Sequence, residues 1–129
     1  MIVADASIVL DLLVPSRATP TDLGARLSTE VVAAPELLDV EVAQVLRRFV
    51  LKNQLDAERA EAALDDLALL PIERYPHASL IGRAFALSEN VTAYDGVYIA
   101  LAEQLNGTLW TRDTALGAVP GLRVRVEVS

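Results

Sequence analysis

Short apolar segments alternate with amphipathic segments of helical periodicity along nearly the whole chain, and this alternation restricts the possible folds most strongly. Strands are expected at residues 1–4, 31–34, 72–74, 108–111 and 122–128, and the first two are apolar runs typical of buried strands. Helical patterns lie at residues 7–13, 21–27, 36–52, 57–69, 76–88 and 93–105. Strands that alternate with helices favour a parallel sheet covered on both faces. Because no repeat or linker interrupts the pattern, the sequence predicts one α/β domain over residues 1–129.

Several of the expected helices carry start and stop signals. Ser7 is placed to cap the helix at residues 7–13, which Pro15 ends. Thr21 or Asp22 can cap the short helix that follows, and Asp56 precedes the helix at residues 57–69. These signals set the expected element boundaries.

The apolar content is high, but it is not arranged to cross a membrane. Hydrophobic residues make up 53% of the chain and the mean hydropathy is +0.36. No apolar run reaches the roughly 18–20 residues that span a bilayer. Asp5 and Asp11 interrupt the N-terminal apolar stretch, so no signal peptide is expected. The chain has no cysteine, which fits a cytoplasmic location, and the surplus apolar surface suits contact with another protein chain.

The charge balance is acidic. The formal net charge is −7, from eighteen acidic and eleven basic residues, and Lys52 is the single lysine. Long-range repulsion opposes binding of a polyanion such as RNA. A nucleic-acid function therefore requires that something cationic covers the acids, either bound Mg²⁺ or Mn²⁺ or a basic partner segment.

Two aspartates lie just after expected strands. Asp5 comes after the first apolar run, and Asp113 closely follows the run at residues 108–111. Ligands of open α/β sheets bind beyond the carboxyl ends of the strands. Either aspartate taken alone is equally explained as a cap of the next helix.

Two further acids lie on expected helices. Asp95 shares a helix side with Tyr98, Ile99 and Ala102, the residues expected to face the core. Glu41 lies at the rim of the apolar stripe of its helix. Each has a structural explanation, because a helix N-terminus favours a carboxylate such as Asp95 and a rim glutamate can extend to water.

Taken together, the four acids predict a metal site. A carboxylate at an apolar boundary is costly unless it is paired or bound to metal, and cations are scarce in this chain. Oxygen ligands suit Mg²⁺ or Mn²⁺, which can activate water and stabilise the leaving oxygen of a phosphodiester. Other catalytic devices are missing from the sequence, which has no cysteine and no glycine-rich phosphate loop. The single histidine, His77, is expected to be a surface or capping residue.

Four motifs in a fixed order resemble those of PIN-domain ribonucleases, and most closely those of VapC-type toxins of bacterial toxin–antitoxin pairs. They are MIVADAS at residues 1–7, PELLDVEVAQVLRR at 35–48, TAYDGVYIALAE at 92–103 and LWTRD at 109–113. The similarity covers essentially the whole chain. It implies a three-layer α/β/α domain with a central parallel sheet, and cleavage of RNA with Mg²⁺ or Mn²⁺.

The resemblance also implies roles for individual residues. Carried over to matching positions, Asp5, Glu41, Asp95 and Asp113 are the catalytic and metal-binding acids. Ser7 and Thr111 are polar supports that orient carboxylates or water, and Arg112 either contacts phosphate or forms a structural ion pair. Gly96 departs from the family, which often has alanine there, and loosens the helix beside Asp95.

The resemblance implies partners as well. We expect a homodimer, an RNA substrate and neutralisation by a cognate, VapB-like antitoxin. A segment of that antitoxin is expected to lay an apolar helix in a groove and direct an arginine at the carboxylates.

Other functions stay open at this point. A phosphatase with Asp5 as nucleophile, like the haloacid-dehalogenase enzymes, typically has a second aspartate where this chain has Ser7, and a lysine near the phosphate. A phosphorylated receiver domain also needs a lysine after a late strand. A catalytically inactive PIN-like binding module, or an α/β domain of another role, fits the same pattern. The sequence distinguishes neither the RNA that is cut nor one metal ion from two.

Overall fold

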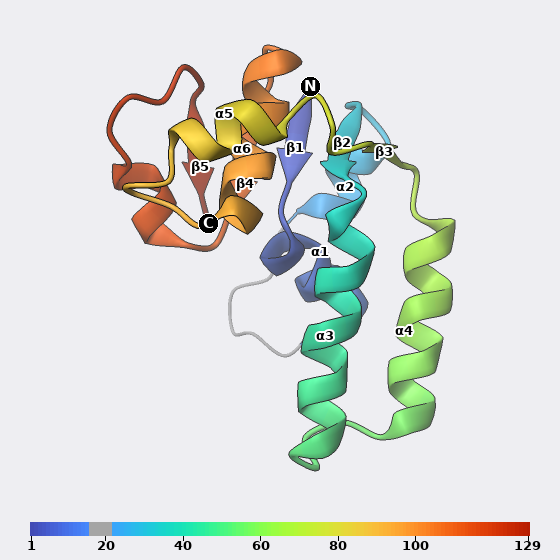
Figure 1. Ribbon diagram of the computed structural model, residues 1–129. Helices are drawn as coiled ribbons and strands as arrows, with labels where there is room; N and C mark the ends of the chain where they lie inside the picture. Colours follow the sequence, from blue (N-terminus) through green and yellow to red (C-terminus); the bar gives the residue numbers. More distant parts are fainter. Residues whose placement is uncertain (16–21) are drawn as a thin grey trace.

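Five parallel strands form the centre of the protein (Figure 1). The structure is a computed structural model that describes residues 1–15 and 22–129. The strands lie in the order β3-β2-β1-β4-β5. Their bounds are β1 Ile2–Ala4, β2 Val32–Pro35, β3 Ile72–Tyr75, β4 Thr108–Thr111 and β5 Val126–Val128. The α/β class and the parallel sheet predicted from the sequence are confirmed.

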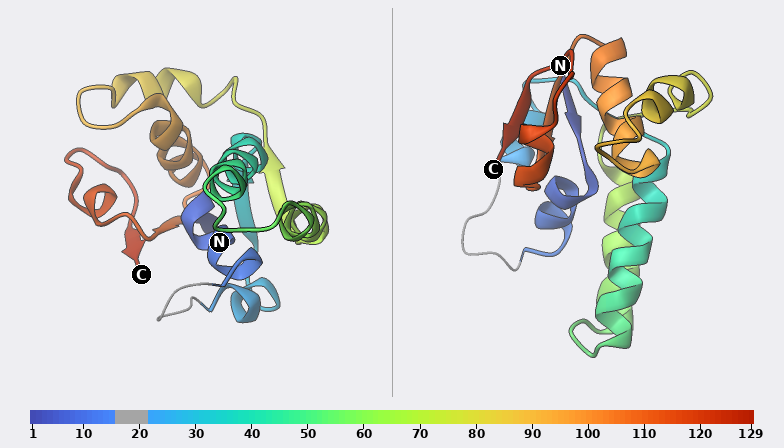
Figure 2. Two further views of the ribbon diagram at one scale, coloured as in Figure 1. Left: turned by 90° about the horizontal axis from the view of Figure 1, so that it is seen from below. Right: turned by 60° about the vertical axis from the view of Figure 1, so that its left-hand side comes forward.

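Helices cover both faces of this sheet. Figure 2 shows α5 (Ile81–Ala86) and α6 (Ala93–Gln104) on one face, with α1 (Ala6–Leu13), α2 (Leu23–Leu27) and α4 (Ala57–Leu69) on the other. The helices α3 (Leu37–Leu51) and α4 form an antiparallel hairpin that extends beyond the edge of the sheet (Figure 1). A short 3₁₀ helix, η1 (Thr114–Ala118), follows β4. The arrangement is the three-layer α/β/α domain that the resemblance implied.

The core is aliphatic and lies between the sheet and its helices. Strands β1 and β2 are buried along their whole length, as expected for the centre of a parallel sheet. Helix α6 crosses the sheet with an unbroken run of buried residues from Gly96 to Ala102. Trp110 and Tyr98 are the largest fully buried side chains among the described residues. No helix in residues 1–15 and 22–129 is both long and apolar enough to span a bilayer.

Gly96 allows the close approach of α5 and α6. A Cβ atom at this position would lie 2.9 Å from the Ala84 Cβ and 3.0 Å from the Ala84 Cα. Such distances are too short for an added methyl group unless one helix shifts. Glycine is therefore required at position 96 by packing, and this explains the departure from the alanine that the resemblance led us to expect.

Several boundary predictions were wrong. The residue that caps α1 is Asp5, not Ser7, because the Asp5 carboxylate accepts the backbone N–H groups of Ser7 and Ile8. Helix α5 begins at Ile81 rather than at residue 76 or 77. The last strand covers only Val126–Val128 instead of residues 122–128.

The cap predictions for the other helices have mixed outcomes. Asp22 and Asp56 occupy the N-cap positions of α2 and α4, but neither side chain makes a capping hydrogen bond. The alternative cap, Thr21, lies outside the described residues.

Candidate active site

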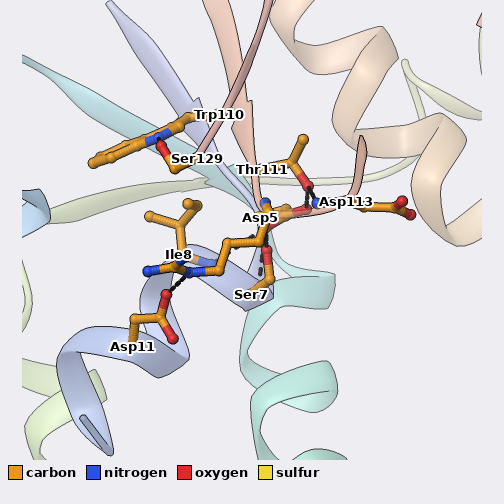
Figure 3. Close-up of polar contacts among 9 residues, drawn as sticks. Asp5, Ser7, Ile8, Asp11, Trp110, Thr111, Asp113 and Ser129 are labelled. Carbon is orange, nitrogen blue, oxygen red and sulfur yellow. Dashed lines mark hydrogen bonds and ion pairs between the residues drawn. The ribbon is translucent and has the colours of Figure 1, made fainter. Parts of the chain in front are cut away.

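Asp5 lies where β1 ends and α1 begins. Its Oδ1 atom accepts the Ser7 N–H at 3.0 Å, the Ser7 Oγ–H at 2.5 Å and the Ile8 N–H at 3.4 Å. Its Oδ2 atom accepts the Thr111 Oγ1–H at 2.5 Å (Figure 3). The carboxylate thus caps a helix on one oxygen and faces the end of β4 with the other.

The ends of β1 and β4 are tied together through two hydroxyl groups. Ser7 Oγ donates to Asp5 and accepts the Arg112 N–H at 3.0 Å. Thr111 Oγ1 donates to Asp5 and accepts the Asp113 N–H at 3.0 Å. Each hydroxyl therefore bridges the Asp5 carboxylate and the backbone after β4. The contacts fit the supporting role that the resemblance assigned to Ser7 and Thr111.

Three helices present the remaining acids. Glu41 lies near the start of α3 and Asp95 in the first turn of α6, and both residues are half-buried. Asp95 is held by its helix cap, because Thr92 Oγ1 accepts the Asp95 N–H at 3.2 Å. Asp113 is exposed and caps η1, since its carboxylate accepts the Ala115 N–H at 2.9 Å.

The acids interact with one another electrostatically. Burial raises the pKa of the Asp5 carboxyl above its ordinary value, although the hydrogen bonds from Ser7 and Thr111 oppose the rise. Burial also raises the pKa of Glu41, and the nearby charges of Asp95 and Asp5 add to the effect. The pKa of Asp95 is raised by burial first and then by the charges of Asp113 and Asp5. These shifts place Asp5, Glu41 and Asp95 within electrostatic range of one another, and Asp113 within range of Asp95.

Tyr98 extends this acidic region into the core. Its hydroxyl is buried and has no partner with hydrogen-bond geometry among the described residues. The Glu41 carboxyl is nevertheless close enough to raise the pKa of this phenol, after burial, which is the larger cause. The Tyr98 hydroxyl and the Glu41 carboxyl are therefore neighbours at the inner end of this acidic region.

The chemistry of this donor set fits a hard divalent cation. It consists of carboxylate oxygens together with a buried phenol, and like charges at this spacing repel unless a cation lies between them. Across residues 1–15 and 22–129, however, no three acidic or histidine side chains are close enough together to enclose a metal ion by themselves. Such an open set suits Mg²⁺, which keeps several of its waters and shares coordination with phosphate oxygens.

Comparison with known proteins identifies the family of this chain. The profile of the PIN domain family matches residues 2–122. This chain belongs to the PIN domain family. Ribonuclease VapC1 of Mycobacterium tuberculosis is 42% identical over 127 residues, which are 98% of this chain and 96% of that protein.

Solved structures show the same fold at much lower sequence identity. VapBC2 from Rickettsia felis matches this PIN domain with a TM-score of 0.72 and 15% identity, over 99% of this chain and 98% of that one. A toxin–antitoxin complex from Klebsiella pneumoniae matches with a TM-score of 0.64 and 19% identity, over 99% and 97% of the two chains. These structural likenesses support the fold alone.

The sequence analysis did not identify Asp11, a charged residue beside the site of this PIN domain. Asp11 is buried in α1, and its Oδ2 atom accepts a hydrogen bond from Arg112 Nε (Figure 3). The structure thus gives Arg112 the ion pair that was one of its two expected roles. The available signal was the acid itself, which interrupts the apolar sequence of α1.

His77 contributes to the placement of α3 in this PIN domain. Its Nε2 atom accepts the Leu37 N–H at 2.9 Å, at the first residue of the helix. The capping role expected for this histidine is confirmed, but the helix that it caps is α3 rather than its own. The ring therefore lies on the element that carries Glu41.

Proposed function

We propose that this PIN domain is a metal-dependent endoribonuclease and the toxin of a toxin–antitoxin pair. The observation that carries the proposal is the convergence of Asp5, Glu41, Asp95 and Asp113 from four elements onto one region. There the charges of Asp95 and Asp5 add to the raised pKa of Glu41, and those of Asp113 and Asp5 add to the raised pKa of Asp95. The 42% identity to Ribonuclease VapC1 over nearly the full length supports RNA as the substrate. RNA cleavage would occur at the phosphodiester backbone.

The four carboxylates would hold Mg²⁺ or Mn²⁺, which when bound supplies an activated water and stabilises charge on the phosphate and leaving oxygen. Asp5 is the most rigidly placed of the four, because three hydrogen bonds fix Oδ1 and one fixes Oδ2. Oδ2 accepts only the Thr111 hydroxyl among the described residues and so keeps an acceptor position for a cation. Ser7 and Thr111 orient this carboxylate, and the Tyr98 hydroxyl faces Glu41 from the core.

The acidic balance of the chain opposes RNA binding unless a cation covers the acids. The net charge of −7 disfavours RNA binding at long range. Local neutralisation by a divalent cation would remove the repulsion at the scissile phosphate. The need for metal would then apply to substrate binding as well as to cleavage.

A groove beside the site is suited to an antitoxin. Two adjoining hollows between α1 and α3 share Ala6, Val45 and Arg48. The remaining lining includes apolar side chains, and Glu41 lies in the same hollow as Tyr94. An apolar helix laid in this groove could direct an arginine at the acids, so we propose a VapB-like antitoxin as its occupant. We also propose a homodimer, as the resemblance implies.

The nuclease is tested with purified protein and labelled RNA in the presence of Mg²⁺ or Mn²⁺. Asp5→Asn and Asp95→Asn should each lower the cleavage rate by at least about 100-fold, since loss of even a supporting contact at a metal site costs 10–100-fold. Chelation should stop the wild-type reaction, and added Mn²⁺ should restore it.

Glu103→Gln provides a matched control, because it removes a carboxylate of α6 that belongs to an arginine pair away from the site. It should cleave RNA at the wild-type rate at a temperature where it is folded. Full activity of Asp95→Asn, or cleavage that chelator does not affect, would contradict the proposal. A chain that binds Mn²⁺ through Asp95 and cleaves no RNA would instead be an inactive binding module.

The antitoxin proposal needs a separate test. The small protein encoded beside this chain should co-purify with it, and Val45→Glu should disrupt the complex by replacing an apolar side chain of the groove with a charged one. Retention of the complex by Val45→Glu would rule out this groove as the docking site.

A further inference from the structure

A buried ion pair lies directly behind the carboxylate site. The Asp11 side chain is 6% exposed and the Arg112 side chain is 12% exposed. Asp11 and Thr111 are the two polar residues that are buried in the described part of the chain. A buried ion pair contributes little net stability compared with apolar side chains of the same size, so its presence here calls for a functional explanation.

The backbone of Arg112 contacts the site, whereas its side chain contacts Asp11 on α1. It lies between Thr111, which donates to Asp5, and Asp113, which is one of the four acids. Its N–H donates to Ser7 Oγ, whereas its Nε atom donates to Asp11. Figure 3 shows Asp11 and Asp113 on opposite sides of Asp5. The guanidinium is therefore held on the side of Asp5 that faces away from Asp113.

The electrostatics of the site agree with this placement. The groups that shift the pKa values of Asp5, Glu41 and Asp95 are burial, hydroxyl or backbone hydrogen bonds, and other acids. No arginine of the described residues is among them, although Arg112 adjoins Asp113 in the sequence. Arg112 is thus not among the groups that shift these three pKa values, and its Nε atom donates to Asp11.

A guanidinium next to a group of carboxylates would ordinarily pair with them. Arginine binds a carboxylate through two parallel N–H groups and is always charged, so it competes well for the oxygens that a metal ion requires. The same chemistry is expected of an antitoxin arginine that inhibits the site. Without a partner on α1, Arg112 would be a competitor built into the chain itself.

We propose that Asp11 is a positioning residue, which holds the Arg112 guanidinium away from Asp5, Glu41, Asp95 and Asp113 and so keeps these acids open to a divalent cation. The proposal rests on the proposed metal-dependent function. It assigns Asp11 no contact with metal or RNA, because Asp11 acts through Arg112.

The test is a Mn²⁺ titration of the full chain by calorimetry, with no RNA present. Asp11→Asn should weaken Mn²⁺ binding about tenfold, which corresponds to roughly 1.4 kcal/mol. The double variant Asp11→Asn/Arg112→Gln removes the competing charge as well, so its affinity should return to within about threefold of wild type. Glu103→Gln breaks another acid–arginine pair, at the opposite end of α6 from Asp95, and should leave the affinity unchanged.

The outcomes separate this inference from the proposed function. Wild-type affinity in a folded Asp11→Asn variant would overturn the inference, and so would a double variant that binds as weakly as the single one. A wild-type chain that binds no Mn²⁺ would contradict the proposed function itself. Trp110, the single tryptophan, lies on β4 and reports by fluorescence whether each variant is folded.

A measurement on the wild type covers the case in which Asp11→Asn does not fold. The Nε–H resonance of Arg112 in ¹⁵N-labelled protein should be protected from exchange with solvent, both before and after saturation with Mg²⁺. Rapid exchange of this proton in either state would show that the pair does not hold the guanidinium, and would overturn the inference.

Discussion

The two ends of helix α6 place carboxylates in opposite electrostatic environments. Asp95 lies in the first turn and Glu103 near the last, about 12 Å apart along the helix axis. The pKa of Asp95 is raised by burial and by the charges of Asp113 and Asp5. The pKa of Glu103 is lowered, chiefly by its hydrogen bonds with Arg83.

Burial raises the pKa of both carboxyls, so the opposite sign at Glu103 comes from its partner. Arg83 Nε and Nη2 contact the two Glu103 oxygens at 2.7 and 3.1 Å, and the Arg123 N–H adds a contact at 2.9 Å. At the other end of α6, the charges that act on Asp95 are those of two further acids, Asp113 and Asp5. One end of α6 therefore carries an acid that is paired with an arginine, while the other carries an acid whose charged form is disfavoured by burial and by neighbouring acids.

The largest effect on stability is expected at the Glu103 end. Glu103→Gln removes a charge that accepts three hydrogen bonds, so the free energy of unfolding should fall by about 1.5–3 kcal/mol. Urea denaturation followed by Trp110 fluorescence measures the change. An unchanged midpoint would show that the contrast between the two ends of α6 has no energetic basis.

The second-largest effect on stability is expected from the packing of α6 against α5 at Gly96. Gly96→Ala adds a methyl group against Ala84 of α5, and overpacking typically costs about 1–3 kcal/mol. The gain in helix propensity is about 1 kcal/mol, so a net loss of stability is expected. Gly82→Ala in α5 is the matched control, because nothing lies within 4 Å of its added Cβ and it should not destabilise the protein. Equal stability of both variants would mean that α5 and α6 do not pack this closely.

The smallest expected effect is an increase in stability. Asp95→Asn relieves repulsion among the acids, so the melting temperature of the metal-free protein should rise by about 2–5 °C. The wild type should gain more from saturating Mg²⁺ than the variant does. A lower melting temperature of Asp95→Asn in chelator would contradict the repulsion.

The pH dependence distinguishes the two ends by its sign. A raised folded-state pKa means that the Asp95 charge costs stability above its ordinary value of 3.8, and that the cost disappears as the pH falls through the folded-state value towards 3.8. The advantage of Asp95→Asn over wild type should therefore shrink between pH 7 and pH 4. Glu103 has a lowered pKa, so its stabilisation is present above 4.5 and is lost as the pH falls through the folded-state value. The disadvantage of Glu103→Gln should shrink at lower pH than the advantage of Asp95→Asn does.

Local patterns in the sequence were sufficient for most of the fold. The helix predicted at residues 57–69 has these bounds in α4, because its stripe of buried residues and the preceding Asp56 are local features. The last strand was overestimated because residues before Val126 are held by another element. Arg83 donates to the Gly121 carbonyl, and Glu103 accepts the Arg123 N–H, so this segment is tied to α5 and α6.

In the candidate site, too, local patterns identified some residues, and long-range contacts determined others. Asp5 and Asp113 were identified from their places after strands, and the structure shows them where the sheet order predicts, at the ends of neighbouring β1 and β4. The pairing of Asp11 with Arg112 joins residues that are 101 positions apart, and no local pattern indicates it. The start of α5 was also misplaced, because the His77 ring packs at the first residue of α3 instead of opening its own helix.

The most direct test of the central claim is a crystal of the wild-type chain soaked in Mn²⁺, with anomalous diffraction data to locate the ion. The claim predicts an anomalous peak bound by carboxylate oxygens from at least three of Asp5, Glu41, Asp95 and Asp113, at about 2.0–2.3 Å. A peak held by other residues, or no peak at these acids at a saturating Mn²⁺ concentration, would contradict it.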